Sequence, residues 1–158
     1  MAERGARLLV VDDNKVNRLL LARSLELQGH TATMAENGRV ALELLRREAF
    51  DLLLLDIEMP EMDGIQVLEQ LKADRQLRDL PVIVTSAIEG LDNVVRCIEL
   101  GAEDYLHKPV NPVLLKARIG ASLEKKRLRD QQKELVQRFA TREVAQDLDN
   151  CGFALGGH

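Results

Sequence analysis

Polar side chains that could do chemistry follow the apolar runs of this chain. Asp12 and Asp13 follow one short run, Asp56 follows four consecutive leucines, and Ser86 and Lys108 end two later runs. Three crowded carboxylates repel one another unless a cation joins them, and such hard oxygen ligands favour Mg²⁺ over zinc. One carboxylate could then act as a nucleophile towards phosphorus. An ammonium and a hydroxyl are the groups that would neutralise the oxygens of an arriving phosphoryl group.

The stretch Leu52–Asp56 is the element around which the others are organised. Its unbroken apolar run ends at a carboxylate, and a turn-forming segment, Met59–Gly64, follows. A short apolar run bounded by turn residues is typical of a strand buried on both faces of a parallel sheet. Ligands of such sheets bind beyond the carboxyl ends of the strands. An Asp at a strand end is also common as a helix cap, so this stretch alone does not decide between chemistry and capping.

Strands and helices are expected to alternate along the chain. The predicted strands are 7–11, 31–35, 52–56, 81–87 and 104–109. The predicted helices cover 15–28 and 91–100, the segments around Val40–Leu45 and Ile65–Leu71, and the chain from about Pro112 onward. In the first helix, the side chains at helical spacing are Val16, Leu19, Leu20 and Leu27. Strict alternation predicts parallel strands, right-handed crossovers and helices on both faces of one sheet.

A long charged helix is expected from about residue 119 to 148, where Pro is absent. Leu114, Ala121, Leu128 and Leu135 recur every seven residues, as in a parallel coiled coil. Lys125, Gln131 and Gln132 lie between them, so the apolar seam is thin. A short coiled coil and a single solvated linker helix therefore both remain open.

Charge is unevenly distributed along the 158 residues. Residues 1–115 carry 13 Lys and Arg against 20 Asp and Glu, a net −7, whereas residues 116–158 carry 9 against 6, a net +3. The interleaved acids and the scarcity of aromatics in the basic part argue against nucleic-acid binding. Cys97 and Cys151 have neither metal-ligand nor disulfide-framework spacing. With no signal peptide and no apolar run of transmembrane length, we expect a cytoplasmic protein without a membrane partner.

Residues 7 to 122 resemble the receiver domain of bacterial two-component response regulators. The motifs that carry the resemblance are Val10-Val11-Asp12-Asp13, Asp56 followed by Met59-Pro60-x-Met62-Asp63-Gly64, Pro81-Val82-Ile83-Val84-x-Ser86-Ala87, and Gly101-Ala102-x-Asp104-Tyr105-Leu106-x-Lys108-Pro109. The resemblance implies an α/β, flavodoxin-like, doubly wound five-stranded parallel sheet of order 2-1-3-4-5 with an extended C-terminal helix. The expected organisation is a receiver domain over 1–122, a helical linker or coiled coil over 123–148, and a loop over 149–158 that leads to an output domain.

The resemblance also implies a role for each site residue. Asp56 would be the phosphoacceptor, and Mg²⁺ would be held by Asp13, Asp56 and the backbone carbonyl of Glu58, with Asp12 acting through water. Lys108 would pair with the phosphoryl group, and the Lys108–Pro109 peptide is usually cis in this family. Ser86, rather than Thr85, would be the switch hydroxyl, because Ala87 sets the register. Tyr105 would turn inward when Ser86 moves towards the phosphate.

The function that follows is a phosphorylation-dependent switch that catalyses only its own aspartyl phosphorylation. A sensor histidine kinase or a phosphotransfer protein would supply the phosphoryl group. The surface formed by the fourth helix, fifth strand and fifth helix would form a homodimer and bring two linker helices together.

Residues 134–148, with Gly152–Gly157, resemble the segment that precedes class III adenylate or guanylate cyclase domains. A diguanylate cyclase, phosphatase or kinase output, or a stand-alone receiver acting through protein contacts, is the alternative. A Walker-type nucleotide hydrolase is disfavoured because the chain has no Gly-x4-Gly-Lys-Ser/Thr loop.

Overall fold

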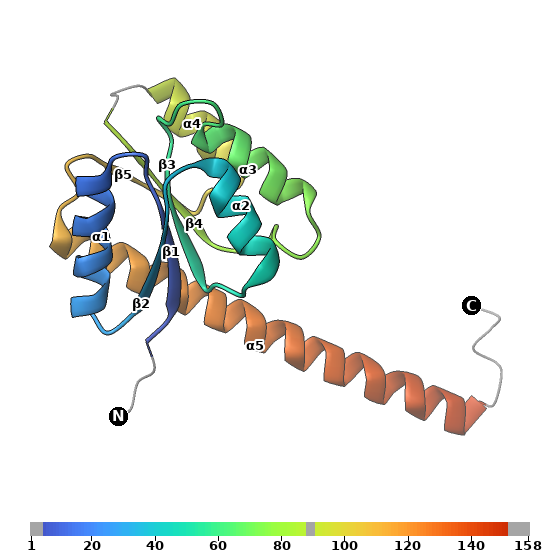
Figure 1. Ribbon diagram of the computed structural model, residues 1–158. Coiled ribbons are helices and arrows are strands. Elements are labelled where there is room, and N and C mark those ends of the chain that lie inside the picture. Colours follow the sequence, from blue (N-terminus) through green and yellow to red (C-terminus); the bar gives the residue numbers. More distant parts are fainter. Residues whose placement is uncertain (1–4, 88–90, 152–158) are drawn as a thin grey trace. The chain divides into compact units, whose positions relative to one another are not determined.

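The computed structural model describes residues 5–87 and 91–151, with the side chains of residue 91 and of 143–151 left aside. Strands and helices alternate throughout this part of the chain (Figure 1). The strands are β1 (Arg7–Val11), β2 (Thr31–Ala35), β3 (Leu52–Asp56), β4 (Val82–Ser86) and β5 (Asp104–His107). The helices are α1 (Lys15–Leu27), α2 (Gly38–Arg47), α3 (Gly64–Ala73), α4 (Leu91–Glu99) and α5 (Pro112–Cys151).

The five strands form one parallel sheet in the order β2-β1-β3-β4-β5, which confirms the expected flavodoxin-like topology. The central position of β3 follows from its sequence, since a run of leucines can be buried on both faces at once. All five β3 residues are buried. Val11 of β1 pairs with Leu55, and Asp56 pairs with Thr85 of β4. The carboxyl ends of β1, β3 and β4 therefore reach the same edge of the sheet.

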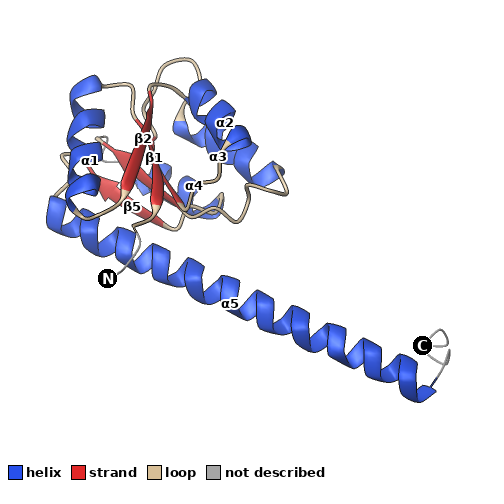
Figure 2. Ribbon diagram, turned by 60° about the horizontal axis from the view of Figure 1, so that its bottom comes forward, coloured by secondary structure: helices blue, strands red, loops and turns tan. Residues whose placement is uncertain are grey.

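Each face of the sheet carries its own apolar core, because successive strand side chains point to opposite faces. Leu53 and Leu55 pack in a core with residues of α2, α3 and α4, whereas Leu52 and Leu54 pack in a second core with residues of α1 and α5. The view in Figure 2 shows α1 on one side of the sheet and α2 and α3 on the other. Full burial of a leucine is worth about 1.5–3 kcal/mol. The four leucines of β3 thus anchor both layers.

The helical spacing in α1 does not mark the buried face of that helix. Val16, Leu19, Leu20 and Leu27 are all exposed, with 47–78% of each residue accessible to solvent. The buried side chains are instead Leu21, Ala22 and Leu25. The helix has apolar residues on more than one face, so periodicity alone could not decide which face packs on the sheet. The exposed set leaves an apolar surface on α1.

Helix starts hold the loops at the carboxyl edge of the sheet. Asn14 caps α1, because its side chain accepts a hydrogen bond from the Asn17 backbone N–H. Asp63 caps α3 in a reciprocal capping box with Gln66. The first residue of α3 must be Gly64, since a Cβ there would lie 2.5 Å from the carbonyl oxygen of Asp56. This close approach holds the α3 start against the end of β3.

The chain divides into two compact units, with the boundary between Leu123 and Glu124 inside α5. In the first unit, Leu115 and Ile119 of α5 are buried in the core shared with α1. Among the described side chains of the second unit, the large apolar ones that are exposed are Leu128, Leu135, Val136 and Phe139. Residues 152–157, which belong to the cyclase-like segment, lie outside the described residues. No helix in the described ranges combines the length and apolar character needed to span a membrane.

Candidate functional site

Three carboxylates converge at the carboxyl edge of the sheet. Asp12 follows β1, Asp13 is next to it, and Asp56 ends β3. One carboxylate oxygen from each lies within 4.8 Å of the others. Asp12 and Asp56 are fully buried, whereas Asp13 is exposed. The structure therefore brings together the three acids that the sequence predicts as a group, and it leaves one of them open to solvent.

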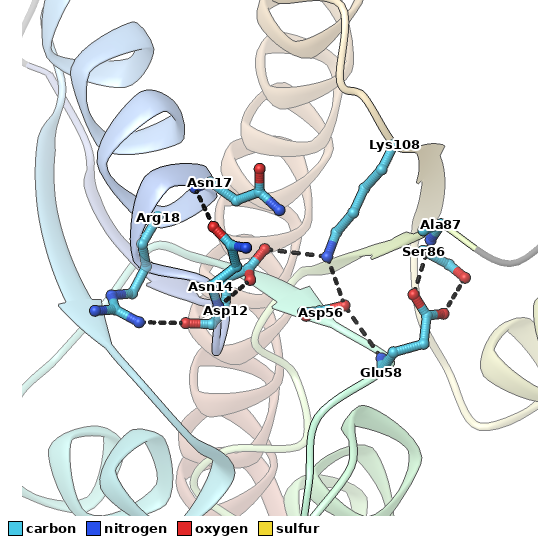
Figure 3. Close-up of polar contacts among 9 residues, drawn as sticks. All are labelled: Asp12, Asn14, Asn17, Arg18, Asp56, Glu58, Ser86, Ala87 and Lys108. Atoms are coloured by element: carbon cyan, nitrogen blue, oxygen red, sulfur yellow. Dashed lines mark hydrogen bonds and ion pairs between the residues drawn. The ribbon is translucent and has the colours of Figure 1, made fainter.

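Lys108 reaches into this cluster from the segment after β5 (Figure 3). Its Nζ lies 3.0 Å from Oδ1 of Asp56 and 3.2 Å from Oδ2 of Asp12, and only 15% of its side chain is accessible. The backbone N–H of Lys108 donates to the carbonyl of Ser86, which ties this segment to β4. The Lys108–Pro109 peptide is cis, as the family resemblance implies. The ammonium thus bridges the two buried carboxylates.

Asp12 is held in place by neighbours that the sequence reasoning missed. Its Oδ1 accepts a hydrogen bond of 2.8 Å from the backbone N–H of Asn14, and its backbone carbonyl accepts one of 2.7 Å from Arg18 (Figure 3). Arg18 lies on α1, one turn after the helix cap. A basic residue at helical spacing is usually solvated, so no pattern in the sequence distinguished it.

The oxygen atoms of the cluster fit a hard divalent cation. Among the described residues, Oδ2 of Asp12 and Oδ2 of Asp56 are buried side-chain oxygens that accept no hydrogen bond, although Lys108 Nζ lies at ion-pair distance from the first. Buried oxygen atoms without a donor are costly. An oxygen-rich, anionic group of this kind, open to water through Asp13, is typical of Mg²⁺ sites. The donor set therefore fits the Mg²⁺ that the sequence predicts.

Burial raises the pKa of Asp56 from 3.8 to about 7. The Lys108 hydrogen bond and ion pair lower this pKa, and the nearby charge of Asp12 raises it, but the loss of hydration is the largest cause. Burial lowers the pKa of Lys108. The hydrogen bonds to Asp56 and Asp12 and the negative charges of these two residues raise it by more, so the net shift of the lysine pKa is upward. The site therefore holds a cationic lysine beside a carboxyl group that resists ionisation.

This raised pKa predicts a pH-dependent stability for the metal-free protein. Between about pH 4 and 7 the folded protein binds more protons at Asp56 than the unfolded chain does, so the stability contributed by this group falls as the pH rises through that window. Asp56→Asn removes the charge. At pH 8 we expect the free energy of unfolding of the variant to exceed that of the wild type by about 1–3 kcal/mol. At pH 5 we expect little difference between the two. Urea denaturation with a chelator measures both, and an equal difference at the two pH values contradicts the expectation.

Ser86 and Glu58 contact each other across the ends of β3 and β4. The Ser86 hydroxyl, which is buried, donates to Oε2 of Glu58, and the Ala87 backbone N–H donates to Oε1 at 2.8 Å (Figure 3). The backbone N–H of Glu58 donates to Oδ1 of Asp56 at 3.1 Å. From the sequence, we expected the backbone carbonyl of Glu58 to bind the metal and, by resemblance to the family, its side chain to lie where hydrolysis of the phosphoryl group is tuned. The sequence predicted no contact between this side chain and Ser86. An acid two residues beyond Asp56 was the available signal for its side chain.

Tyr105 lies on β5, opposite Val84 of the neighbouring strand. It is half-buried and packs against the core shared with α2, α3 and α4. Its neighbour Asp104 accepts two hydrogen bonds of 2.8 Å from Arg118 of α5. Tyr105 is therefore one strand removed from the carboxylate cluster, at the boundary between core and surface.

Comparisons with known proteins find similarity over most of this chain. The family model described as the response regulator receiver domain matches residues 8–120. Response regulator PleD of Caulobacter vibrioides is 38% identical over 137 residues, which are 87% of this chain and 30% of that protein. Response regulator MprA of Mycobacterium leprae is 37% identical over 146 residues, which are 88% of this chain and 63% of that protein. The CheY-like receiver domain protein of Methanospirillum hungatei superposes with a TM-score of 0.74 at 30% identity, over 79% of this chain and 98% of that one.

Proposed function

The chain belongs to the response regulator receiver domain family, and from this premise we propose that Asp56 accepts a phosphoryl group in the presence of Mg²⁺ and that the product switches an output. The observation that carries the proposal is the state of Asp56. Its carboxylate is fully buried, yet Oδ2 accepts no hydrogen bond from the described residues while Oδ1 is held by Lys108 and the Glu58 N–H. One oxygen is thus fixed and the other remains available.

The metal would be held by Asp13, Asp56 and the backbone carbonyl of Glu58, with Asp12 acting through water. When bound, Mg²⁺ supplies positive charge that allows the carboxylates to ionise together and that neutralises oxygens on phosphorus. The ammonium of Lys108, in the segment after β5, would supply the remaining positive charge. Asp13 is the exposed member of the cluster, which suits a ligand that meets the ion as it arrives from solvent.

In the proposed transfer, an oxygen of Asp56 forms a bond to phosphorus. The bond from phosphorus to the donor, an imidazole nitrogen or an acyl oxygen, breaks and its electron pair stays with the donor. The protein places the nucleophile, excludes water by burial and stabilises the charge on the transferred group, which are its main tasks in phosphoryl transfer. The chain is thus a regulatory domain whose only chemistry is its own phosphorylation. Incubation with acetyl phosphate and Mg²⁺, followed by intact-mass measurement, tests for the gain of one phosphate per chain.

Switching would begin at Ser86. A phosphoryl group on Asp56 adds acceptor oxygens at the edge of the sheet where the Ser86 hydroxyl lies. Movement of Ser86 towards that group would leave space that Tyr105 fills by turning inward from its half-buried position on β5. The change would thereby reach the surface of α4, β5 and α5, as expected for a two-state element biased by a local charge.

The partner that donates the phosphoryl group, a histidine kinase or a phosphotransfer protein, would dock beside α1. Val16, Leu19 and Leu20 form an exposed apolar surface there. Next to it is a cavity of about 220 Å³ lined in part by Leu20, Asp12 and Lys108. An apolar surface that adjoins the acceptor suits a partner that must deliver a reactive group to Asp56.

A homodimer would form through α4, β5 and α5, and it would bring two linker helices together. Val95 and Ile98 on α4, together with Leu128 and Leu135 in the second unit, are exposed apolar side chains. We expect Leu128→Cys and Leu135→Cys, in a chain with Cys97→Ala and Cys151→Ala, to crosslink between copies with a yield that changes when a phosphoryl analogue binds. Gln137→Cys, which lies on another face of the helix, is the matched control. Identical crosslinking with and without the analogue contradicts this coupling.

The output would be a nucleotide cyclase, and the support for it is the sequence of residues 134–148 and 152–157 alone. A diguanylate cyclase, phosphatase or kinase remains the alternative, as does a stand-alone receiver. The curated relatives are longer than this chain, which spans 30% of PleD and 63% of MprA. Cyclic nucleotide formation by a longer chain that contains residues 1–158, with and without a phosphodonor, tests the cyclase output.

A further inference from the structure

The carboxylate of Glu58 accepts hydrogen bonds from two donors at the end of β4. One of its oxygens accepts from the Ser86 hydroxyl and the other accepts from the Ala87 backbone N–H, 2.8 Å away (Figure 3). At the same time the backbone N–H of Glu58 donates to Asp56. Glu58 therefore links the acceptor strand to the segment that carries the switch hydroxyl, through its backbone on one side and its side chain on the other.

These two donors are the kind that an anion on Asp56 would require. A hydroxyl and an adjacent backbone N–H are typical partners of phosphoryl oxygens. Each has a single proton and can satisfy one strong acceptor well. A phosphoryl oxygen and the Glu58 carboxylate therefore compete for the same protons. Both acceptors are negatively charged, so their simultaneous presence is further disfavoured by repulsion.

The contacts of Glu58 also show how it could be released. In the described part of the chain, no cation lies within ion-pair distance of its carboxylate, and Lys108 pairs with Asp56 and Asp12 instead. The carboxylate is held by two neutral donors, and the residue remains half-exposed. Its departure would return a charged group to water without breaking a buried ion pair, which keeps the cost of release moderate.

We propose that Glu58 is an internal competitor for the phosphoryl group. Its carboxylate holds Ser86 and Ala87 in the unphosphorylated protein and must leave when a phosphoryl group on Asp56 takes these donors. This inference rests on the proposed function of Asp56. It makes Glu58 a positioning residue that restrains the switch until the phosphoryl group displaces it, and it adds a cost to every anion that binds at the site.

Beryllofluoride, a non-covalent phosphoryl mimic, tests the competition at fixed Mg²⁺. Tyr105 is the single tyrosine of a chain that has no tryptophan, so its fluorescence reports binding. Glu58→Gln keeps the size of the side chain but has one acceptor oxygen instead of two. We expect its apparent Kd to be lower than that of the wild type by about tenfold, which corresponds to about 1.4 kcal/mol. Glu58→Ala, which removes both acceptors, is expected to change in the same direction.

Two controls separate competition from a loss of charge. Glu61→Gln removes an exposed charge from the same loop and should leave the Kd within about twofold of wild type. Glu58→Gln should also have a smaller effect in a Ser86→Ala background than in the wild type, because one contested donor is already gone. If Glu58→Gln has the same effect in both backgrounds, or none in the wild type, the competition is refuted.

The proposed function can fail separately from this inference. If wild type binds beryllofluoride, Asp56→Asn does not, and Glu58→Gln equals wild type, then the acceptor assignment stands and the role of Glu58 falls. If neither the wild type nor any Glu58 variant binds the mimic, the acceptor assignment itself falls. Thermal unfolding of each variant without ligand establishes that it is folded in each comparison.

Discussion

Asp56→Asn is expected to abolish phosphorylation of the chain by acetyl phosphate. The amide nitrogen and oxygen of Asn keep the shape of the side chain, but an amide is a far weaker nucleophile than a carboxylate. Loss of the nucleophile in a covalent mechanism lowers the reaction rate by about 10³-fold or more. Intact-mass measurement after incubation with the donor and Mg²⁺ should show one added phosphate on the wild type and none on the variant.

A matched variant controls for the removal of a carboxylate in general. Asp51 lies at the other end of β3, where its side chain accepts a hydrogen bond from the backbone N–H of Arg7. Asp51→Asn is expected to take up phosphate at the wild-type rate, since it lies outside the carboxylate cluster. Uptake of phosphate by Asp56→Asn at a similar rate would show that another residue is the acceptor.

Lys108→Ala is expected to slow phosphorylation by about 100-fold, the size of effect seen when one charge-stabilising group is removed from a reaction site. The ammonium is the cation closest to Asp56 among the described residues, with 3.0 Å between Nζ and Oδ1. Without it, the charge that develops on the transferred group would be neutralised by the metal alone. Phosphorylation kinetics with acetyl phosphate measure this directly, and Lys116→Ala, which removes an exposed lysine of α5, should react like the wild type.

Metal binding distinguishes this explanation from simple damage to the site. Lys108 pairs with one oxygen of Asp12 and one oxygen of Asp56 in the carboxylate cluster. Its removal should leave these carboxylates more available, so Mg²⁺ is expected to bind Lys108→Ala at least as tightly as wild type. Slow phosphorylation together with intact Mg²⁺ binding supports a role for the ammonium in charge stabilisation. Slow phosphorylation together with lost Mg²⁺ binding would indicate that the variant has lost the carboxylate cluster instead.

The sequence was sufficient to predict the sheet and the meeting of the acids. Four leucines that end at Asp56 require burial on both faces, and parallel topology brings the ends of neighbouring strands to one edge. For this reason Asp12, Asp56 and Lys108 could be placed together before any geometry was known. Their contacts depend on which strands are neighbours, and alternation of strands with helices strongly restricts that choice.

Other features depend on side-chain orientation, which the sequence pattern does not contain. The apolar spacing of α1 pointed to Val16 and Leu20, but Leu21 and Leu25 are the residues that pack on the sheet. A helix that has apolar residues on two faces has two possible packings, and only the tertiary structure selects one. The contact of Glu58 with Ser86 depends in turn on the course of the loop after β3, where the backbone of Gly64 passes close to Asp56. No local spacing encodes that approach.

The most direct test of Asp56 as the phosphoacceptor is to locate the phosphoryl group chemically. Borohydride reduces an aspartyl phosphate to homoserine with release of phosphate, and peptide mass spectrometry then identifies the converted residue. After treatment with acetyl phosphate and Mg²⁺, we expect homoserine at position 56 and aspartate at positions 12 and 13. Homoserine at another position, or phosphate that resists borohydride on Ser86, would contradict the assignment of Asp56 as the phosphoacceptor.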